Sequence, residues 1–436
     1  MMQKIDLRGH SDLSRSELQQ ILPRATLDTT KALERVQKLI AEVKNHGEVA
    51  LYRHAEKFDG VTGHSLKVSK EEIIKAHSGA EQPLIIALET LIARVKQAST
   101  AQVPNRRVTE VVPGGVITQR WQPVNRVGLY VPGGKAVYPS SVVMNVVAAQ
   151  TAGVKQIAIA SPVQKETGGV HPTILAAAHI LGIHEIYAIG GASAIAAFAY
   201  GVPEINLESV DIVTGPGNIY VAAAKRALQG VVGIDSEAGT TEILIIADGQ
   251  ADPKSVAADL LSQAEHDEAA ASVLITDSEE LLHDVENELR LRLRKMEHET
   301  RASLALGGPQ SALILVDSID QAVDVSNAYA PEHLSVQTLD PHTTIMNISD
   351  AGAIFLGNYT PVSLGDYLAG SNHVLPTGGT ARFAAGLGAY TFLRPQQIVE
   401  YSEGALLAAN DNLTILANAE GLPAHAAAVH ARVTEQ

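Results

Sequence analysis

The spacing of apolar and polar residues divides the chain into a helical beginning and two stretches of alternating strands and helices. Over the first ~120 residues, apolar side chains recur at helical spacing and predict helices at residues 30–43, 70–77 and 83–98. From Arg126 onwards, short β-rich runs alternate with alanine-rich segments. Strands are predicted at 127–131, 156–160, 185–189 and 211–213, with helices between them at 141–152, 172–181 and 192–200.

A second alternation follows the first. It predicts strands at 242–246, 272–275, 312–316 and 353–356, with helices at 253–266, 278–301 and 319–328. Regular alternation of strand and helix is typical of a parallel sheet wound on both faces. The predicted fold class is therefore α/β, with two Rossmann-like, doubly wound parallel-sheet domains.

These patterns divide the chain into four segments. Residues 1–125 are expected to be mainly helical and to pack on the second α/β domain, while 126–238 form the first α/β domain and 239–381 the second. Residues 382–436 are rich in Gly and Ala and then helical, with too few strong strands for a third sheet. We expect this C-terminal tail to need another surface on which to pack.

Composition and charge exclude several classes of function. The formal net charge of −15 argues against general nucleic-acid binding, which depends on Lys and Arg neutralising phosphates. Cysteine is absent, so any metal must be held by nitrogen and oxygen ligands. The first residues carry charges where a signal peptide needs an apolar stretch, and no run reaches the ~18 apolar residues of a membrane span. We expect a cytoplasmic protein that acts on small molecules.

Three glycine clusters follow predicted strands of the first α/β domain, at 132–134, 190–191 and 215–217. Free backbone amides at a helix start suit a phosphate group. Tight turns that need positive φ are the alternative interpretation of each cluster. No G-x-G-x-x-G occurs. Three clusters at strand ends of one domain favour a dinucleotide that is bound without the usual fingerprint.

Candidate chemistry lies in the second α/β domain and the tail. Glu332 and His333 place a carboxylate beside an imidazole, a pair suited to proton transfer near neutral pH. Gln263 and His266 lie one helical turn apart on the same predicted helix face, away from its apolar side. Each group taken alone is also typical of a solvated surface. With Asp366 and His425, Gln263 and His266 would provide the nitrogen and oxygen donors that zinc accepts, although spacing alone does not select this set from 16 histidines.

Motifs along nearly the whole chain resemble the histidinol dehydrogenase family. The most specific segments are 126–134, 215–220, 262–266, 365–367 and 372–377. The resemblance implies a zinc-dependent homodimer that oxidises L-histidinol to L-histidine with two NAD molecules, the last steps of histidine biosynthesis. It also implies that the C-terminal tail is exchanged between the two subunits.

The resemblance assigns roles to individual residues. It implies that His333 accepts the hydroxyl proton, and that Glu332 activates water for the second oxidation. The implied zinc ligands are Gln263, His266, Asp366 and, from the partner subunit, His425. The residues implied to contact the substrate are Thr241, Gln263, His266, His333, Asp366, Glu420 and His425. The residues implied to contact NAD are Tyr130, Ser193 and Asn218.

One departure from the family pattern and two alternatives bear on function. The family often has Gln where this chain has Ser193, whose shorter side chain reaches less far towards NAD. A paralogous zinc and NAD dehydrogenase of another small alcohol, such as a sulfopropanediol, is one alternative, which Glu420 disfavours because a carboxylate repels a sulfonate. A non-catalytic, zinc-stabilised dimer that binds nucleotide is the other. The intact pair of Glu332 and His333 argues against it.

Overall fold

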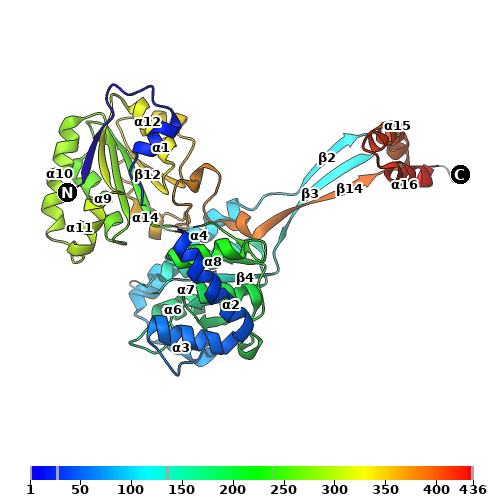
Figure 1. Ribbon diagram of the computed structural model, residues 1–436, viewed down its shortest axis with the longest axis horizontal. Helices are drawn as coiled ribbons and strands as arrows, with labels where there is room; N and C mark the ends of the chain where they lie inside the picture. Colours follow the sequence, from blue (N-terminus) through cyan, green and yellow to red (C-terminus); the bar gives the residue numbers. More distant parts are fainter. Residues whose placement is uncertain (1, 26–28, 134–136, 238, 434–436) are drawn as a thin grey trace.

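The computed structural model describes residues 2–25, 29–133, 137–237 and 239–433. Two α/β lobes lie side by side, and a long arm projects away from both of them to end at the C-terminus (Figure 1). Within the described ranges, no helix is both long and apolar enough to cross a membrane.

The first lobe is built on a parallel sheet with the strand order β6-β5-β4-β7-β8. This is the order 3-2-1-4-5 of a doubly wound sheet, as the alternating pattern predicts. Its strands are β4 (Arg126–Tyr130), β5 (Gln156–Ser161), β6 (Ile186–Ala188), β7 (Ile212–Thr214) and β8 (Gly233–Ile234). Its connecting helices are α5 (Pro139–Ala152), α6 (Pro172–Ile180), α7 (Gly191–Tyr200) and α8 (Ile219–Leu228).

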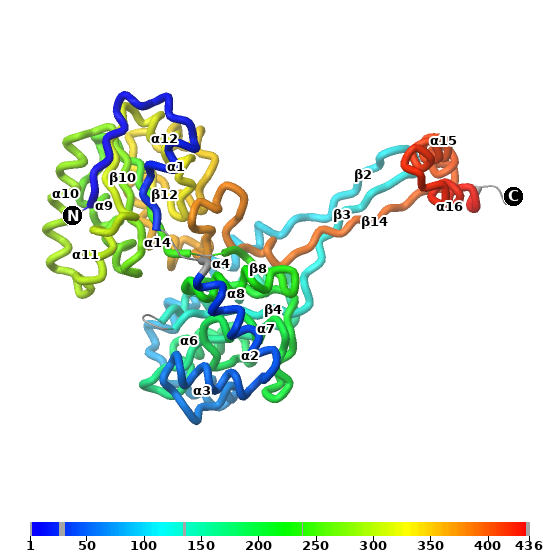
Figure 2. Tube along the Cα trace, in the orientation of Figure 1, coloured from blue at the N-terminus to red at the C-terminus, as the bar shows by residue number. Residues whose placement is uncertain are grey.

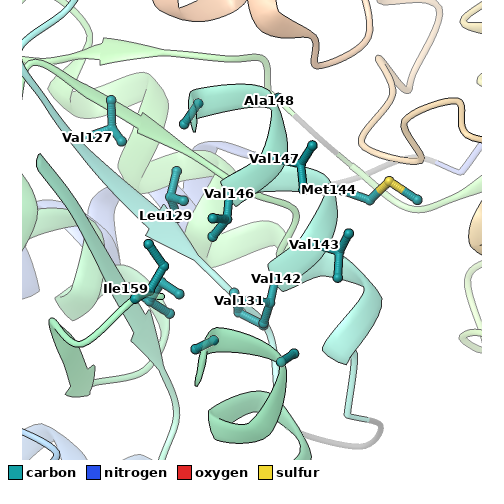
Figure 3. Close-up of a cluster of buried hydrophobic side chains, with 14 of the residues drawn as sticks. Val127, Leu129, Val131, Val142, Val143, Met144, Val146, Val147, Ala148 and Ile159 are labelled. Atoms are coloured by element: carbon teal, nitrogen blue, oxygen red, sulfur yellow. The ribbon is translucent and has the colours of Figure 1, made fainter. Parts of the chain in front are cut away.

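Helix α5 forms the centre of the first lobe's core, and Figure 3 shows Val142 and Val146 towards the strands, with Val143 and Val147 on the other side of the helix. Val142, Val143, Val146 and Val147 are all buried, so the helix is apolar around most of its circumference. Such a helix needs cover on both sides. The sheet covers one side, and α4 (Gln82–Ala101) packs on the helix from outside the α/β unit.

The second lobe repeats the same strand order, β11-β10-β9-β12-β13, with β1 (Gln3–Asp6) added beside β11. All of its strand pairs are parallel. The strands are β9 (Glu242–Ala247), β10 (Ala271–Thr276), β11 (Ala312–Leu315), β12 (His333–Gln337) and β13 (Ala353–Leu356). The helices are α9 (Pro253–Ala264), α10 (Glu279–Leu293), α11 (Glu299–Gly307), α12 (Ile319–Tyr329), α13 (Pro341–Thr344) and α14 (Val362–Tyr367). The single helix predicted over 278–301 is thus two helices.

The N-terminal region divides between the lobes. Of the elements described before residue 126, β1 and α1 (Arg15–Ile21) belong to the second lobe, where α1 packs on α12. Helices α2 (Thr29–His54), α3 (Lys70–Ser78) and α4 pack instead on α7 and α8, on α6 and on α5 of the first lobe. The expectation that residues 1–125 pack on the second α/β domain is therefore wrong for α2 and α3, whereas α4 also contacts that domain, because Arg94 donates to the backbone oxygen of Leu368 at 2.7 Å. Their apolar stripes predict burial, but both sheets offer an apolar face to cover them.

The arm contains the third sheet that the tail was expected to lack. Strands β2 (Arg107–Val112) and β3 (Gly115–Pro123) pair antiparallel, and β14 (Leu393–Tyr401) pairs with β3 along its whole length (Figure 2). At the tip, α15 (Glu403–Ala419) packs on α16 (Pro423–Val433). Most of the side chains of β2 and β14 are exposed, so no buried face produces the alternation from which a strand is recognised. The remaining short helical turns are η1 (Ala55–Asp59), η2 (Pro203–Ile205), η3 (Ile345–Asn347), η4 (Thr380–Arg382) and η5 (Ala389–Phe392).

Candidate active site

Glu332 and His333 lie where strand β12 begins, beside the start of β9. Both side chains are buried. Glu332 Oε2 accepts a hydrogen bond from Thr241 Oγ1 at 2.6 Å and another from the backbone N–H of Glu242 at 2.8 Å. Two donors from the start of β9 therefore hold one oxygen of this carboxylate in place, and a charged acceptor strengthens both bonds.

The hydrogen bonds of His333 fix which ring nitrogen carries a proton. Nδ1 lies 3.1 Å from the backbone oxygen of Glu242, and a carbonyl only accepts, so Nδ1 must donate. Within the described ranges Nε2 has no hydrogen-bond partner, which leaves it to exchange a proton with a ligand. Burial opposes the charged ring, but the carboxylate of Glu332, 3.5 Å from Nδ1, outweighs it and the pKa of His333 is raised to about 9.

Gln263 is joined to this pair through Thr241. Its Nε2 donates to Thr241 Oγ1 at 2.6 Å, and the single hydroxyl proton of Thr241 goes on to Glu332. The amide is therefore oriented with Oε1 away from Thr241, free to face a ligand. The helix predicted over 253–266 is shorter in the structure. Helix α9 ends at Ala264, and His266 lies in the turn that follows it.

Asp366 lies on α14, which packs on α9, and its charge contributes to the raised pKa of His333. His373 holds the backbone of this segment through a hydrogen bond. Its Nδ1 donates to the backbone oxygen of Asp366 at 2.9 Å, so its Nε2 accepts from Ser141 of α5 at 3.0 Å. Both ring nitrogens are occupied, and burial lowers the pKa of His373. These contacts give His373 a hydrogen-bonded, positioning role.

Glu420 and His425 lie elsewhere, at the tip of the arm (Figure 1). They line an apolar cavity of about 920 Å³ formed with Val112, Tyr401 and Leu416. The described part of this single chain accordingly holds no group of three or more His, Asp or Glu side chains placed to bind a metal. The fold places Gln263 and Asp366 on neighbouring helices but leaves His425 and Glu420 apart from them.

Glu242 is a buried residue of this site that the sequence reasoning missed. Its carboxylate accepts from Tyr329 Oη at 3.2 Å and from the backbone N–H of Gly378 at 3.1 Å, and it lies 3.9 Å from Arg24. Burial raises the pKa of Glu242 to about 7. The sequence feature that could have identified it is a glutamate at the first position of an otherwise apolar strand.

The residues expected to contact a nucleotide lie at the carboxyl ends of the first lobe's strands. Tyr130, which ends β4, is buried and its hydroxyl accepts from the backbone N–H of Gly191 at 3.1 Å. Ser193 is buried, and its hydroxyl lies 2.8 Å from Nδ1 of His54. Asn218 is exposed and caps α8 by accepting from the N–H groups of residues 220 and 221. The three glycine clusters follow β4, β6 and β7 at this same edge, where open α/β sheets bind ligands, although residues 134–136 lie outside the described ranges.

A buried ion pair holds the turn after β7. Lys225 Nζ lies 2.6 Å from Asp235 Oδ1 and also donates to the backbone oxygen of Gly215, while Asp235 Oδ2 accepts from the Gly215 N–H at 2.8 Å. Gly215 has φ +117°, and a Cβ atom there would lie 2.0 Å from the backbone oxygen of Tyr130. Only glycine fits this position, so this cluster does need its positive φ.

Comparison with known proteins identifies the relatives of this chain. Residues 22–433 match the family model for histidinol dehydrogenase. The chain is 57% identical over 436 residues to histidinol dehydrogenase of Leifsonia xyli, covering 100% of both chains, and 52% identical to that of Thermobifida fusca, covering 100% of this chain and 98% of the relative. The crystal structure of histidinol dehydrogenase from Elizabethkingia anophelis superposes with a TM-score of 0.93 at 34% identity, over 99% of this chain and 98% of that one.

Proposed function

The chain belongs to the histidinol dehydrogenase family, and from this premise we propose that it oxidises L-histidinol to L-histidine, through bound L-histidinal, with zinc and two NAD molecules. The observation that best supports the proposal is the chain of contacts from Gln263 through Thr241 to Glu332, with His333 beside it. These contacts join a candidate metal ligand to a proton-transfer pair. A metal ligand and a proton-transfer pair are both needed to oxidise an alcohol substrate that a metal ion holds in place.

The residues of the second lobe suit a zinc ion. Oε1 of Gln263 is turned away from its partner Thr241, and His266 and Asp366 have no side-chain hydrogen bond among the described residues. One amide oxygen, one imidazole and one carboxylate form a borderline nitrogen and oxygen set that zinc accepts. Zinc, when bound, would orient the amino and imidazole nitrogens of the substrate and neutralise charge near its reacting carbon. The fourth proposed ligand is His425.

His425 would come from the partner subunit of a homodimer. In one chain the arm carries His425 and Glu420 away from the second lobe, and apolar side chains of its tip are exposed. Ile415 is 66% exposed and Leu416 65%, which is unusual for side chains that lie close together on one helix. A second chain that covered this tip would bury these apolar side chains. Glu420 and His425 would then lie beside the second lobe of that second chain. Glu420 would then attract the cationic end of the amino alcohol.

The first oxidation needs a base for the hydroxyl proton. Nε2 of His333 is the ring nitrogen left to receive it, because Nδ1 donates to the backbone oxygen of Glu242. As the proton moves to His333, the alcohol carbon loses a hydride and becomes an aldehyde. NAD, when bound, supplies the hydride acceptor.

The second oxidation needs water. Glu332 is fixed through one carboxylate oxygen by Thr241 and Glu242, so the other oxygen is available to take a proton from water as it adds to the aldehyde. The gem-diol formed in this way would pass a hydroxyl proton to Nε2 of His333, once His333 has released its first proton to solvent, and NAD, when bound, would supply the second hydride acceptor. The carboxylic acid that results ionises to the carboxylate. The same closely spaced pair therefore acts in both halves of the reaction.

The test is turnover of L-histidinol by the purified full-length protein. The proposal predicts two NADH and one L-histidine for each histidinol consumed, and loss of turnover on chelation that zinc restores. A panel of other primary alcohols, including a sulfopropanediol, serves as the control. Failure to oxidise histidinol in the presence of zinc and NAD, or faster oxidation of a sulfonated alcohol, would contradict the proposal.

A further inference from the structure

An acidic side chain that the proposed mechanism does not use lies at the ligand-binding edge of the first lobe. Asp59 ends the short helix η1, outside the α/β unit. A Cβ atom at Gly190 would lie 3.5 Å from Oδ2 of Asp59 and 3.0 Å from Cβ of Pro162. Pro162 follows β5 and Gly190 follows β6, so the carboxylate lies over the carboxyl ends of two neighbouring strands.

The carboxylate of Asp59 is partly buried, and it makes no hydrogen bond or ion pair within the ranges that the structure describes. Burial raises the pKa of Asp59 to about 6. A partly buried carboxylate without donors is unfavourable, because it has lost water and gained nothing in exchange. Such a group at a ligand-binding edge indicates that a ligand provides the missing donors.

Two hydroxyls at this edge already have partners within the lobe. The hydroxyl of Tyr130 already accepts from Gly191. Burial raises the pKa of Tyr130 to about 12, and the nearby charge of Asp59 adds to this. The hydroxyl of Ser193 is paired with His54, whose Nε2 is in turn 3.1 Å from Glu42. The Ser193 hydroxyl is therefore directed into the lobe, and it points away from the NAD contact that a longer side chain would make.

We propose that Asp59 accepts hydrogen bonds from the two adjacent hydroxyls of the adenosine ribose of NAD, and that its charge excludes NADP. A carboxylate with two oxygens matches a vicinal diol, and it repels the phosphate that NADP carries on the 2′ oxygen. In doubly wound sheets an acidic residue often performs this task from the end of the second strand. Here it comes from a helix that precedes the sheet in the sequence.

One nearby cation opposes this selectivity and defines a control. Lys165 lies over Gly60, where a Cβ atom would be 3.1 Å from Nζ. If this lysine governed recognition, it would attract a 2′-phosphate and favour NADP. Replacing each residue separately distinguishes the two effects.

The test compares Asp59→Asn, Lys165→Gln and the control Glu56→Gln, an exposed carboxylate on the same short helix. Loss of one charged acceptor is expected to raise KM and Kd for NAD by about 10-fold to 100-fold. The ratio of kcat/KM for NAD over NADP should fall by a similar factor or more, with kcat and the KM for histidinol within about twofold of the parent. Glu56→Gln should match the parent, and Lys165→Gln should keep the preference for NAD.

The inference rests on the proposed use of NAD, and its failure is distinguishable from failure of that proposal. If the parent neither binds nor reduces NAD, the proposed function is wrong. If the parent uses NAD but Asp59→Asn, with an unchanged melting temperature, keeps the affinity for NAD and the discrimination against NADP, the role of Asp59 is refuted. Asp59→Ser serves as a second variant should the amide destabilise the fold, and the same two outcomes decide it.

Discussion

Replacing Glu332 by Gln should separate the two halves of the reaction and move the pH dependence of the first. The substitution keeps the size of the side chain, and the amide oxygen still accepts from Thr241 Oγ1 and from the backbone N–H of Glu242. What it removes is the negative charge 3.5 Å from Nδ1 of His333. We therefore expect a folded variant with an altered base.

The structure sets the size of this effect. Raising the pKa of His333 from 6.5 to about 9 corresponds to about 3 kcal/mol in favour of the charged ring. With that pKa only about 3% of His333 is neutral at pH 7.5, and the neutral fraction grows as the pH rises. Without the Glu332 charge, burial lowers the pKa of His333, although Asp366 and the backbone oxygen of Glu242 still raise it, so the neutral fraction is larger at the same pH.

The assay follows each oxidation separately over about pH 6 to 10. For histidinol as substrate, the ascending limb of kcat should move to lower pH in Glu332→Gln, by up to about two pH units. A bound zinc cation would lower the pKa of His333 in parent and variant alike, so the downward direction stands. For L-histidinal as substrate, the rate should fall by about 10²-fold to 10⁴-fold, because the group that takes a proton from water is gone.

Glu265→Gln is the matched control, because it removes an exposed carboxylate from the end of α9 without touching the pair. It should leave both profiles unchanged. An unshifted ascending limb in Glu332→Gln would refute the coupling of His333 to Glu332. Full-speed oxidation of histidinal by that variant would refute the assignment of Glu332 to water.

Three further predictions concern the lobes separately. Lys225→Met should lower the free energy of unfolding by about 3–5 kcal/mol, measured by denaturant titration, because Asp235 is left buried without its partner; an unchanged midpoint would contradict this. Gly215→Ala should weaken NAD binding and lower the melting temperature, since its Cβ atom overlaps the backbone oxygen of Tyr130; native affinity for NAD would show that the turn is not needed. Chelation should abolish turnover while calorimetry still detects NAD binding, because the nucleotide contacts lie in the first lobe, whereas the proposed metal ligands lie in the second lobe and the arm; loss of both together would indicate one coupled site.

The two α/β repeats were predictable because each strand is a short apolar run bounded by turns. Strand β12 was missed, and it is the one that begins with His333. Ser335 and Gln337 interrupt its apolar pattern, although both are buried, and Gln337 is bound to Asp259. Polar side chains that are satisfied inside the fold resemble surface residues in a sequence.

The arm and the N-terminal helices show a different limit. Paired residues of β3 and β14 are 270 or more positions apart in the sequence, and β14 is exposed along most of its length, so no local pattern marks the pairing. An apolar stripe on α4 predicts burial, but the choice between two similar lobes depends on tertiary packing. For the same reason, the sequence alone does not predict the surface on which the C-terminal tail packs.

The sequence predicted which residue types belong to the candidate site. It did not predict the contacts between them. Glu332 and His333 are adjacent in sequence, whereas the bonds from Thr241 to Gln263 and Glu332 span 22 and 91 residues. Glu242 and Asp59 carry no motif, and their importance lies in burial and neighbours that only the folded chain has. The hydrogen bond of His54 to Ser193 likewise depends on α2 packing on α7.

The central claim, that each active site combines one chain's second lobe with the other chain's arm, is tested most directly by complementation. His333→Ala and His425→Ala are each expected to be inactive as homodimers. Co-expressed with different affinity tags and purified as a mixed dimer, they should regain about half of the parent's activity, because one of the two sites then has both histidines. A mixed dimer without activity would show that His333 and His425 act within the same chain, and would contradict the shared site.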